Sequence, residues 1–178
     1  GVAHKGNMAG GDSIPTGKCL ILVTPDAKRT MTTSLSISSY MDDQDLDLDE
    51  IANSKIVYIE GYMVTSDENY QCVLEILNHL KDFPEVKIAL SLSDPGIVAG
   101  FKNKFEEIAA FGLSYLFGND DEAIAFVGAT NIGEALEILQ SRSYTSVITL
   151  GEEGSAVVSS NEVIKTPRVN IEPIDTNG

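Results

Sequence analysis

The sequence is poor in the residues that mark disulfide-bonded and zinc-binding proteins. It has no tryptophan, two cysteines and two histidines in 178 residues. Cys19 and Cys72 are too few for a disulfide framework, which favours a reduced, cytoplasmic setting. Together with His4 and His79 they have no recognisable metal-ligand spacing, so we exclude a cage of histidine and cysteine ligands.

Basic residues are also scarce, and long apolar runs are missing. The chain has 12 Lys and Arg against 27 Asp and Glu, a net charge of −15. Binding to nucleic acid regardless of its sequence needs clustered Lys and Arg, so we exclude nucleic acid as a partner. No stretch approaches the roughly 18 consecutive apolar residues of a membrane span, and residues 1–13 have no apolar core of signal-peptide type. A phosphorylated small ligand remains compatible with this charge, because backbone N–H groups and one or two cations suffice to bind it.

What is present predicts one α/β domain. A chain of 178 residues with 43% hydrophobic residues is long and apolar enough for a single buried core. Residues 17–24 and 29–38 are β-branched runs joined by a turn at Pro25, which predicts a hairpin. Strands and helices then alternate from residue 55 to residue 151, which predicts βαβ units with a parallel sheet and right-handed crossovers.

The elements of this α/β region follow from its hydrophobic periodicity. The expected strands are residues 55–61, 86–92, 113–118 and 146–151. The expected helices are residues 67–80, with Asp67 as N-cap, 99–110, 121–128 and 131–140, and residues 155–160 and 162–167 are expected to form a closing hairpin.

An acid-rich segment, residues 42–50, precedes this region. From Asp45 its Asp-x-Asp-x-Asp spacing resembles the start of a calcium loop. Such a loop needs Gly at its sixth position and Glu at its twelfth, and this chain has Glu50 and Ile56 there. We therefore favour a solvated loop that supplies acids to the N-terminus of a short helix near residues 47–53.

The stretch GGDSIPTGKC invites comparison with a phosphate-binding P-loop. That motif has Gly, four residues, then Gly-Lys and Ser or Thr at the start of a helix. Here five residues separate Gly11 from Gly17, Cys19 replaces the hydroxyl residue, and a strand follows. We interpret the stretch as a loop.

Candidate site residues lie where the parallel strands end, because ligands of such sheets bind at the carboxyl ends of the strands. The segments at those ends are residues 93–94, 119–122, 151–154 and 175–178. In the second segment an amide and a carboxylate, Asn119 and Glu122, would point into the crevice, where a carboxylate can hold Mg²⁺ through water. The alternative for this pair is a helix cap with acids in the first turn.

The other two segments carry glycines suited to a nucleotide. Gly151 and Gly154 would let backbone approach a nucleotide closely, although the same residues also serve a plain turn. Asp175 and Gly178 stand where consecutive N–H groups can form an anion hole for a transferring phosphoryl group. Each segment alone is ambiguous.

The order of these motifs resembles the ribokinase-like, or PfkB, family of sugar and nucleoside kinases, and its adenosine kinases most closely. Members carry Asn-x-x-Glu, then Thr-x-Gly-x-x-Gly, then Asp-Thr-x-Gly-Ala-Gly-Asp, whose last Asp is the catalytic base. This chain has Asn119-Asp-Asp-Glu122, Thr149-Leu-Gly151-Glu-Glu-Gly154 and Asp175-Thr-Asn-Gly178. The segment TPDAKRT is similar to the family's lid hairpin, in which an Arg, here Arg29, reaches the transferring phosphate.

The resemblance covers the chain from about Pro15 onward and implies a fold and an activity. The fold would be a ribokinase-like three-layer α/β/α sandwich, with a lid hairpin at about residues 15–40 and a core at about residues 55–178. Residues 1–178 would be the central part of one kinase domain, both ends of which lie outside them, with the base three residues beyond Gly178. We therefore expect an ATP- and Mg²⁺-dependent kinase that phosphorylates the hydroxymethyl group of a nucleoside, turning adenosine into AMP.

The resemblance also implies roles for individual residues. Asp175 and Gly178 would shape the anion hole, and Glu122 would order Mg²⁺. Arg29 would neutralise charge that develops on the phosphoryl group. The nucleotide would be bound at Asn119, Thr149, Gly151 and Gly154, and the acceptor would pack under the lid residues Cys19 and Met31.

Two other interpretations stay open. One is a sugar kinase for ribose or fructose, and the other is a binding or regulatory relative that keeps the fold and has lost the base. The expected partner is thus a small nucleoside or sugar, bound by a monomer or a homodimer. The sequence that follows Gly178 would distinguish a kinase from a non-catalytic relative.

Overall fold

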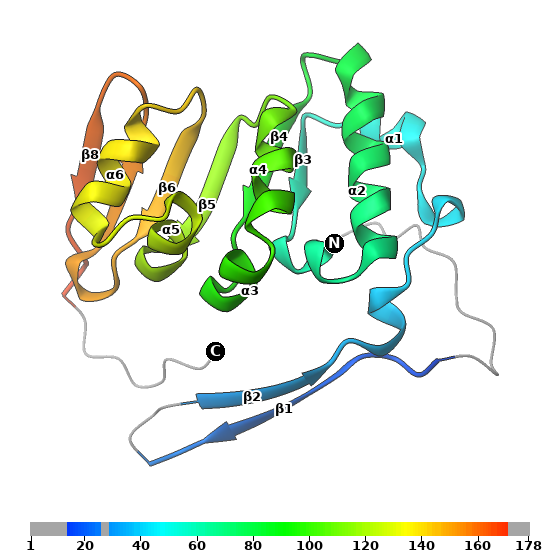
Figure 1. Ribbon diagram of the computed structural model, residues 1–178, viewed down its shortest axis with the longest axis horizontal. Coiled ribbons are helices and arrows are strands. Elements are labelled where there is room, and N and C mark those ends of the chain that lie inside the picture. The colour runs from blue at the N-terminus through cyan, green and yellow to red at the C-terminus, as the bar shows by residue number, and fades with distance from the viewer. Residues whose placement is uncertain (1–13, 26–28, 171–178) are drawn as a thin grey trace.

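The computed structural model describes residues 14–25 and 29–170 and consists of a hairpin and a larger sheet covered by helices (Figure 1). The hairpin pairs β1 (Lys18–Val23) with β2 (Arg29–Ser34) in antiparallel register. Every residue of both strands is exposed. The hairpin predicted from the β-branched runs is therefore confirmed.

The larger sheet has six strands in the order β3-β4-β5-β6-β7-β8. Their bounds are β3 Ile56–Ile59, β4 Lys87–Ser91, β5 Tyr115–Asn119, β6 Thr145–Thr149, β7 Ser155–Val158 and β8 Val163–Thr166. The first four strands pair in parallel, and β7 and β8 join in antiparallel register. The predicted parallel region and the closing hairpin are both confirmed.

The helices of the α/β region lie on one face of this sheet (Figure 1). The helices are α1 Leu48–Ala52, α2 Asp67–His79, α3 Pro95–Gly100, α4 Lys102–Ala110, α5 Asp120–Val127 and α6 Ile132–Gln140, with 3-10 turns at Ser36–Ser39, Asp43–Asp45, Gly61–Thr65, Leu80–Asp82 and Gly151–Glu153. Parallel strands that follow one another in sequence order, joined by right-handed crossovers, place every connecting helix on the same side. Of the described helices, none is long and apolar enough to cross a membrane.

Two helix starts differ from the sequence-based expectation. Ser66, and not Asp67, caps α2, because its side chain accepts a hydrogen bond from the Asn69 N–H at 3.1 Å. The single helix expected at residues 99–110 is two helices, broken at Phe101, which has φ −123°. The first of the two helices, α3, begins before residue 99, where the single helix was expected to start. Asp94 caps it and Pro95 occupies its first turn, and these residues are a strong helix-start signal.

The hydrophobic core lies between the helices and the face of the sheet that they cover. On the central strands, the residues that point to this face are buried, and so are the helix residues packed on them. The largest are Leu90, Leu116 and Ile148 from the strands and Leu77, Phe105, Ile108, Phe126 and Leu139 from the helices. The alternation of strand side chains thus fixes which residues face the helices.

The opposite face of the sheet carries exposed apolar side chains. Ile56 is 51% exposed, Tyr58 56%, Phe117 36% and Ile164 49%, and the Tyr58 and Phe117 rings lie 6.5 Å apart. The described residues therefore form the sheet and one helical layer of the expected three-layer sandwich. The predicted α/β class is confirmed.

Candidate functional site

The junction between β5 and α5 carries the most tightly built polar pair at the carboxyl ends of the parallel strands. Asn119 ends β5 and caps α5, and its side-chain oxygen accepts from the Glu122 N–H at 2.8 Å. In return Glu122 accepts from the Asn119 N–H at 3.0 Å and from its side-chain amide at 2.9 Å. This reciprocal capping box satisfies helix N–H groups that would otherwise lack partners. The helix-cap alternative from the sequence is therefore what the structure contains.

Glu122 is unusual for a carboxylate because it is only 7% exposed. Burial raises its pKa above the ordinary value, and the hydrogen bond from the Asn119 N–H partly opposes this. The negative charges of Asp94, Glu60 and Asp120 raise the pKa further. Acidic groups from three different strand ends therefore converge on this carboxylate, so a bound cation would be electrostatically favoured there.

The geometry around Glu122 limits how it could hold Mg²⁺. Within residues 14–25 and 29–170, no three or more Asp, Glu, His or Cys side chains are arranged to bind a metal ion. Each Glu122 oxygen accepts one hydrogen bond from Asn119, which leaves each oxygen a further lone pair. This donor set fits a hydrated Mg²⁺ held through water, since this ion keeps several of its waters.

The glycine turn after β6 lies next to this pair. Thr149 ends β6 and is the register partner of Asn119 on β5. Gly151 and Gly154 follow with φ of 54° and 97°, which favour glycine. A Cβ on Gly154 would lie 2.1 Å from the Thr166 carbonyl oxygen, whereas Gly151 has nothing within 4 Å. Gly154 is thus required by packing, and Gly151 offers open backbone to a ligand.

The β1–β2 hairpin, which was predicted to be a lid, brings its three predicted site residues to one face. Arg29 pairs with Val23, Met31 with Ile21, and Cys19 with Thr33. Residues that face each other across an antiparallel pair, and every second residue along a strand, share a face. Arg29, Met31 and Cys19 therefore lie on the same face. Lys18 pairs with Ser34 and belongs to the other face.

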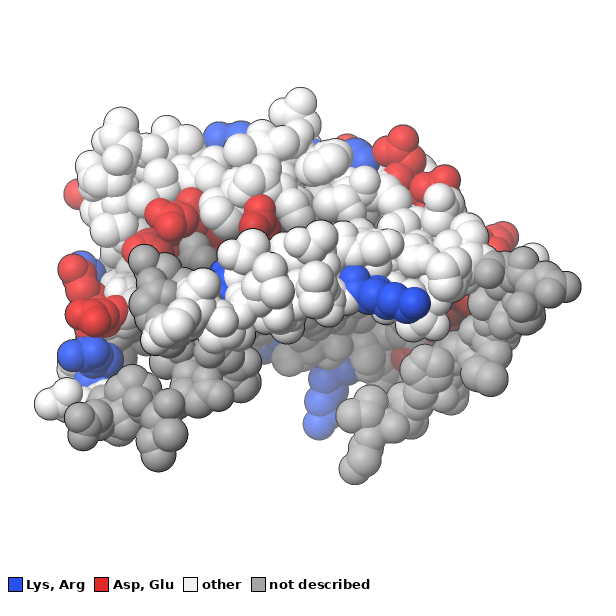
Figure 2. Space-filling view, turned by 90° about the horizontal axis from the view of Figure 1, so that it is seen from below, with Lys and Arg blue, Asp and Glu red and all other residues white. Residues whose placement is uncertain are grey.

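Figure 1 shows the hairpin below the edge at which the parallel strands end, and Figure 2 shows acidic side chains gathered on the core beside it. Tyr62, in the turn after β3, lies near the carboxylates of Asp94, Glu60 and Glu122. Burial raises the pKa of its hydroxyl, and Asp94 and Glu60 raise it further. Glu122 and the hairpin residue Cys19 also raise the pKa of the Tyr62 hydroxyl. The hydroxyl of Tyr62 thus lies within the electrostatic reach of carboxylates of the core and of Cys19 on the hairpin.

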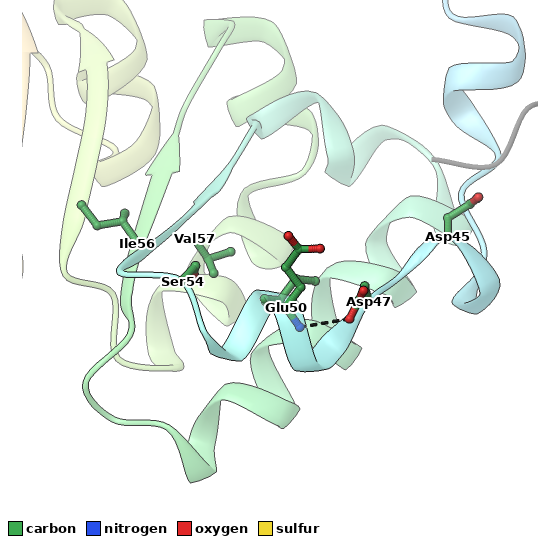
Figure 3. A pocket seen from close by; sticks show the side chains of 7 residues that line it. Asp45, Asp47, Glu50, Ser54, Ile56 and Val57 are labelled. Atoms are coloured by element: carbon green, nitrogen blue, oxygen red, sulfur yellow. Dashed lines mark hydrogen bonds between the residues drawn. The ribbon is translucent and has the colours of Figure 1, made fainter. Parts of the chain in front are cut away.

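A separate pocket of about 390 Å³ lies at the other end of β3 (Figure 3). Its acids come from the acid-rich segment, and its apolar wall is Ile51, Ile56 and Val57. Asp47 caps α1, accepting from the Glu50 N–H at 3.0 Å, as the dashed line in Figure 3 marks. The predicted short helix with acids at its start is therefore confirmed.

The structure brings five of the sequence-predicted residues to one stretch of the sheet edge: Asn119, Glu122, Thr149, Gly151 and Gly154. It brings Arg29, Met31 and Cys19 to one face of the hairpin. Asp175 and Gly178 lie outside the described residues. Glu60 and Tyr62 were not among the predicted site residues. Glu60 lay inside the expected strand 55–61, which in the structure ends at Ile59. Tyr62 follows the expected strand, so the rule on strand ends would have found it.

The structure resembles solved kinase structures. Adenosine kinase from Sinorhizobium meliloti is 30% identical with a TM-score of 0.84, the match covering 92% of this chain and 50% of that one. A probable sugar kinase from Rhizobium etli is 24% identical with the same TM-score and the same coverage. Anopheles gambiae adenosine kinase, in complex with P1,P4-di(adenosine-5) tetraphosphate, is 23% identical with a TM-score of 0.78, over 93% of this chain and 53% of that one. The chain thus spans about half the length of these proteins.

The family assignment rests on a match between this sequence and a family model. The sequence model of the pfkB family of carbohydrate kinases matches residues 10–178. Among curated proteins none matches the chain. The match covers the β1–β2 hairpin and every other described strand and helix. The chain belongs to the pfkB family of carbohydrate kinases.

Proposed function

We propose that this chain is part of an ATP-dependent kinase that transfers the γ-phosphoryl group to the hydroxymethyl group of adenosine. The observation that carries the proposal is the pairing of Asn119 with Thr149 at the ends of β5 and β6. This pairing sets the Asn119–Glu122 capping box beside the Gly151–Gly154 turn. A polar carboxylate and open glycine backbone thus lie next to each other, as a Mg²⁺-bound nucleotide requires.

Phosphoryl transfer asks the protein mainly for positioning and charge stabilisation. The acceptor hydroxyl oxygen attacks the γ-phosphorus, the bond to the bridging oxygen breaks, and ADP leaves. The hydroxyl proton goes to a carboxylate base expected in sequence beyond Gly178. Mg²⁺ supplies neutralising charge to the phosphate oxygens when bound.

Seven of the predicted residues have individual roles in this proposal. Glu122 orders the water shell of Mg²⁺, and Gly151 admits the nucleotide to open backbone. Arg29 supplies positive charge to the transferring group from the lid. Asp175 and Gly178 contribute to the anion hole. Cys19 and Met31 form an apolar wall over the acceptor, on the lid face that also carries Arg29.

The acceptor is the least constrained part of the proposal. Adenosine is supported by the adenosine kinases among the similar structures and by the apolar character of the lid face. A sugar kinase is the second candidate, because the probable sugar kinase matches with an equal TM-score of 0.84. A non-catalytic relative is the third interpretation.

The test uses the full-length protein that contains this chain. We expect calorimetry to give adenosine a much lower dissociation constant than ribose or fructose. We also expect ADP release that depends on adenosine and Mg²⁺. Equal or reversed affinities would favour the sugar kinase, and binding without phosphorylation of any of the three acceptors would favour the non-catalytic relative.

A further inference from the structure

The turn after β4 holds a serine in an unfavourable backbone conformation. Ser93 has φ 69°, in the left-handed region that residues with a Cβ avoid. The Asp94 N–H donates to the Leu92 carbonyl at 2.8 Å, so the chain reverses within three residues. Such a conformation persists only where the surrounding structure holds it.

Glu60 at the end of β3 makes the contacts that hold this turn. One of its carboxylate oxygens accepts from the Ser93 hydroxyl, and the other accepts from the Tyr58 hydroxyl at 3.1 Å. The Ser93 oxygen in turn accepts from the Gly61 N–H at 3.0 Å. The ends of β3 and β4 are therefore joined through one serine hydroxyl. We call the Glu60–Ser93 pair the clamp.

Gly61 lets the two strand ends approach closely enough for the clamp to form. A Cβ at this position would lie 2.5 Å from the Ser91 carbonyl oxygen and 2.8 Å from that of Leu92. It would also lie 2.8 Å from the Ser93 hydroxyl. Only glycine fits where backbones are packed this tightly.

From the clamp a continuous set of contacts reaches Glu122. Leu92, next to Ser93, is fully buried, and its N–H donates to the Phe117 carbonyl at 2.9 Å. A Cβ on Gly118 would lie 3.0 Å from the Leu92 side chain and 3.1 Å from a Glu122 oxygen. The Leu92 side chain and the Glu122 carboxylate thus both border the space that a side chain at position 118 would occupy.

We propose that Glu60 and Ser93 are positioning residues for Glu122. The inference rests on the proposed function, in which Glu122 orders Mg²⁺. Without the clamp, the turn relaxes toward a right-handed conformation and Leu92 withdraws from Gly118. The Glu122 carboxylate then loses a neighbour beside Gly118 that limits its movement, although its hydrogen bonds to Asn119 are untouched.

The test compares clamp variants with a surface control in the full-length protein. Ser93→Ala removes the hydroxyl and keeps the Cβ that disfavours a left-handed φ, and Glu60→Ala removes the acceptor. We expect each to raise the free Mg²⁺ needed for half-maximal turnover about threefold to tenfold. Glu60→Gln keeps an oxygen that can accept from Ser93 and removes only the negative charge that acts on Glu122, so we expect a smaller rise. Glu85→Gln replaces an exposed carboxylate before β4 and should change nothing.

A double-mutant cycle separates positioning from general loosening of the fold. Coupled residues give non-additive effects, whereas independent residues add. Once Glu122→Gln is present, Ser93→Ala should cause no further change in the Mg²⁺ requirement. The inference would be overturned if the fold-changes in Mg²⁺ requirement of Ser93→Ala and Glu122→Gln multiplied fully in the double variant. It would also be overturned if the clamp variants behaved like Glu85→Gln.

A second cycle does not depend on kinase activity. The midpoint of urea unfolding of the full-length protein is measured for Ser93→Ala, Glu122→Gln and the double variant. Non-additive shifts support the coupling, and additive shifts contradict it. A wild-type protein with no kinase activity would contradict the proposed function alone, because this cycle would still decide whether the clamp and Glu122 are coupled.

Discussion

Asn119 and Glu122 are bound to each other by three hydrogen bonds of 2.8, 2.9 and 3.0 Å across the first turn of α5. The pair by itself therefore makes a complete helix cap. Its carboxylate is nevertheless buried beside three other acids, which a helix cap does not require. Capping and cation binding thus make different demands on the same side chain, and substitution can separate them.

Replacing Glu122 with Gln should affect catalysis far more than stability. A glutamine at this position still accepts a hydrogen bond from Asn119, and Gln serves in capping boxes as Glu does. We expect the free energy of unfolding to change by no more than about 1 kcal/mol. The full-length enzyme should turn over more slowly and need more Mg²⁺ for half its maximal rate. An unchanged Mg²⁺ dependence in steady-state assays would leave Glu122 a helix cap only.

The pH dependence of stability should report the environment of Glu122. The pKa of Glu122 in the folded protein is raised above the ordinary value of 4.5, which applies to the unfolded chain. At pH values between the unfolded and the folded pKa, the folded protein therefore binds more protons than the unfolded one. The contribution of Glu122 to stability therefore falls as pH rises through this window. The difference in free energy of unfolding between Glu122→Gln and wild type should therefore favour the variant more at pH 7 than at pH 4. Urea unfolding at several pH values measures this difference.

Glu134 provides a control of opposite sign. Hydrogen bonds from the Thr130 N–H and hydroxyl, at 2.8 and 2.7 Å, lower its pKa below 4.5. Its stabilising contribution is present above the ordinary pKa and is lost as pH falls through the folded value. Relative to wild type, Glu134→Gln should therefore be least stable near neutral pH. Equal pH profiles for the Glu122 and Glu134 variants would contradict both assignments.

Arg29 should act on the transition state. A cation that meets charge developing during transfer lowers the barrier without strengthening ground-state binding. We expect Arg29→Ala to lower kcat about 10²- to 10³-fold, with a much smaller change in KM for ATP. Lys18→Ala is the matched control, because Lys18 lies on the opposite face of the same hairpin. An effect confined to KM would reassign Arg29 to nucleotide binding.

The two glycines of the turn after β6 should differ in their tolerance of alanine. Gly151→Ala meets no atom within 4 Å and costs only the left-handed backbone, about 1–2 kcal/mol. Gly154→Ala costs about 1–3 kcal/mol for its conformation alone, and its Cβ overlaps the Thr166 carbonyl at 2.1 Å. Denaturant unfolding should therefore rank Gly154→Ala as clearly the less stable. For Gly151→Ala the larger change should be in ATP affinity.

The sequence was sufficient for features that depend on neighbours along the chain. Alternating apolar strands and amphipathic helices specify βαβ units, and their handedness then places the helices on one face. Asn119 with Glu122, and Asn131 with Glu134, show helix starts directly in their spacing. Where the prediction failed, at Ser66 and at α3, a competing local signal had been overlooked: Ser before Asp, and Asp-Pro.

Tertiary packing decided the features that join distant segments. Glu60 and Ser93 are 33 residues apart, and their contact depends on the parallel register of β3 with β4 and on the missing side chain of Gly61. Cys19 shares a face with Arg29 only because of the hairpin register. The left-handed φ of Ser93 has no local cause, since serine alone avoids that conformation. Periodicity and capping are written in short stretches of chain, whereas register, close backbone approach and strain arise only when those stretches pack against one another.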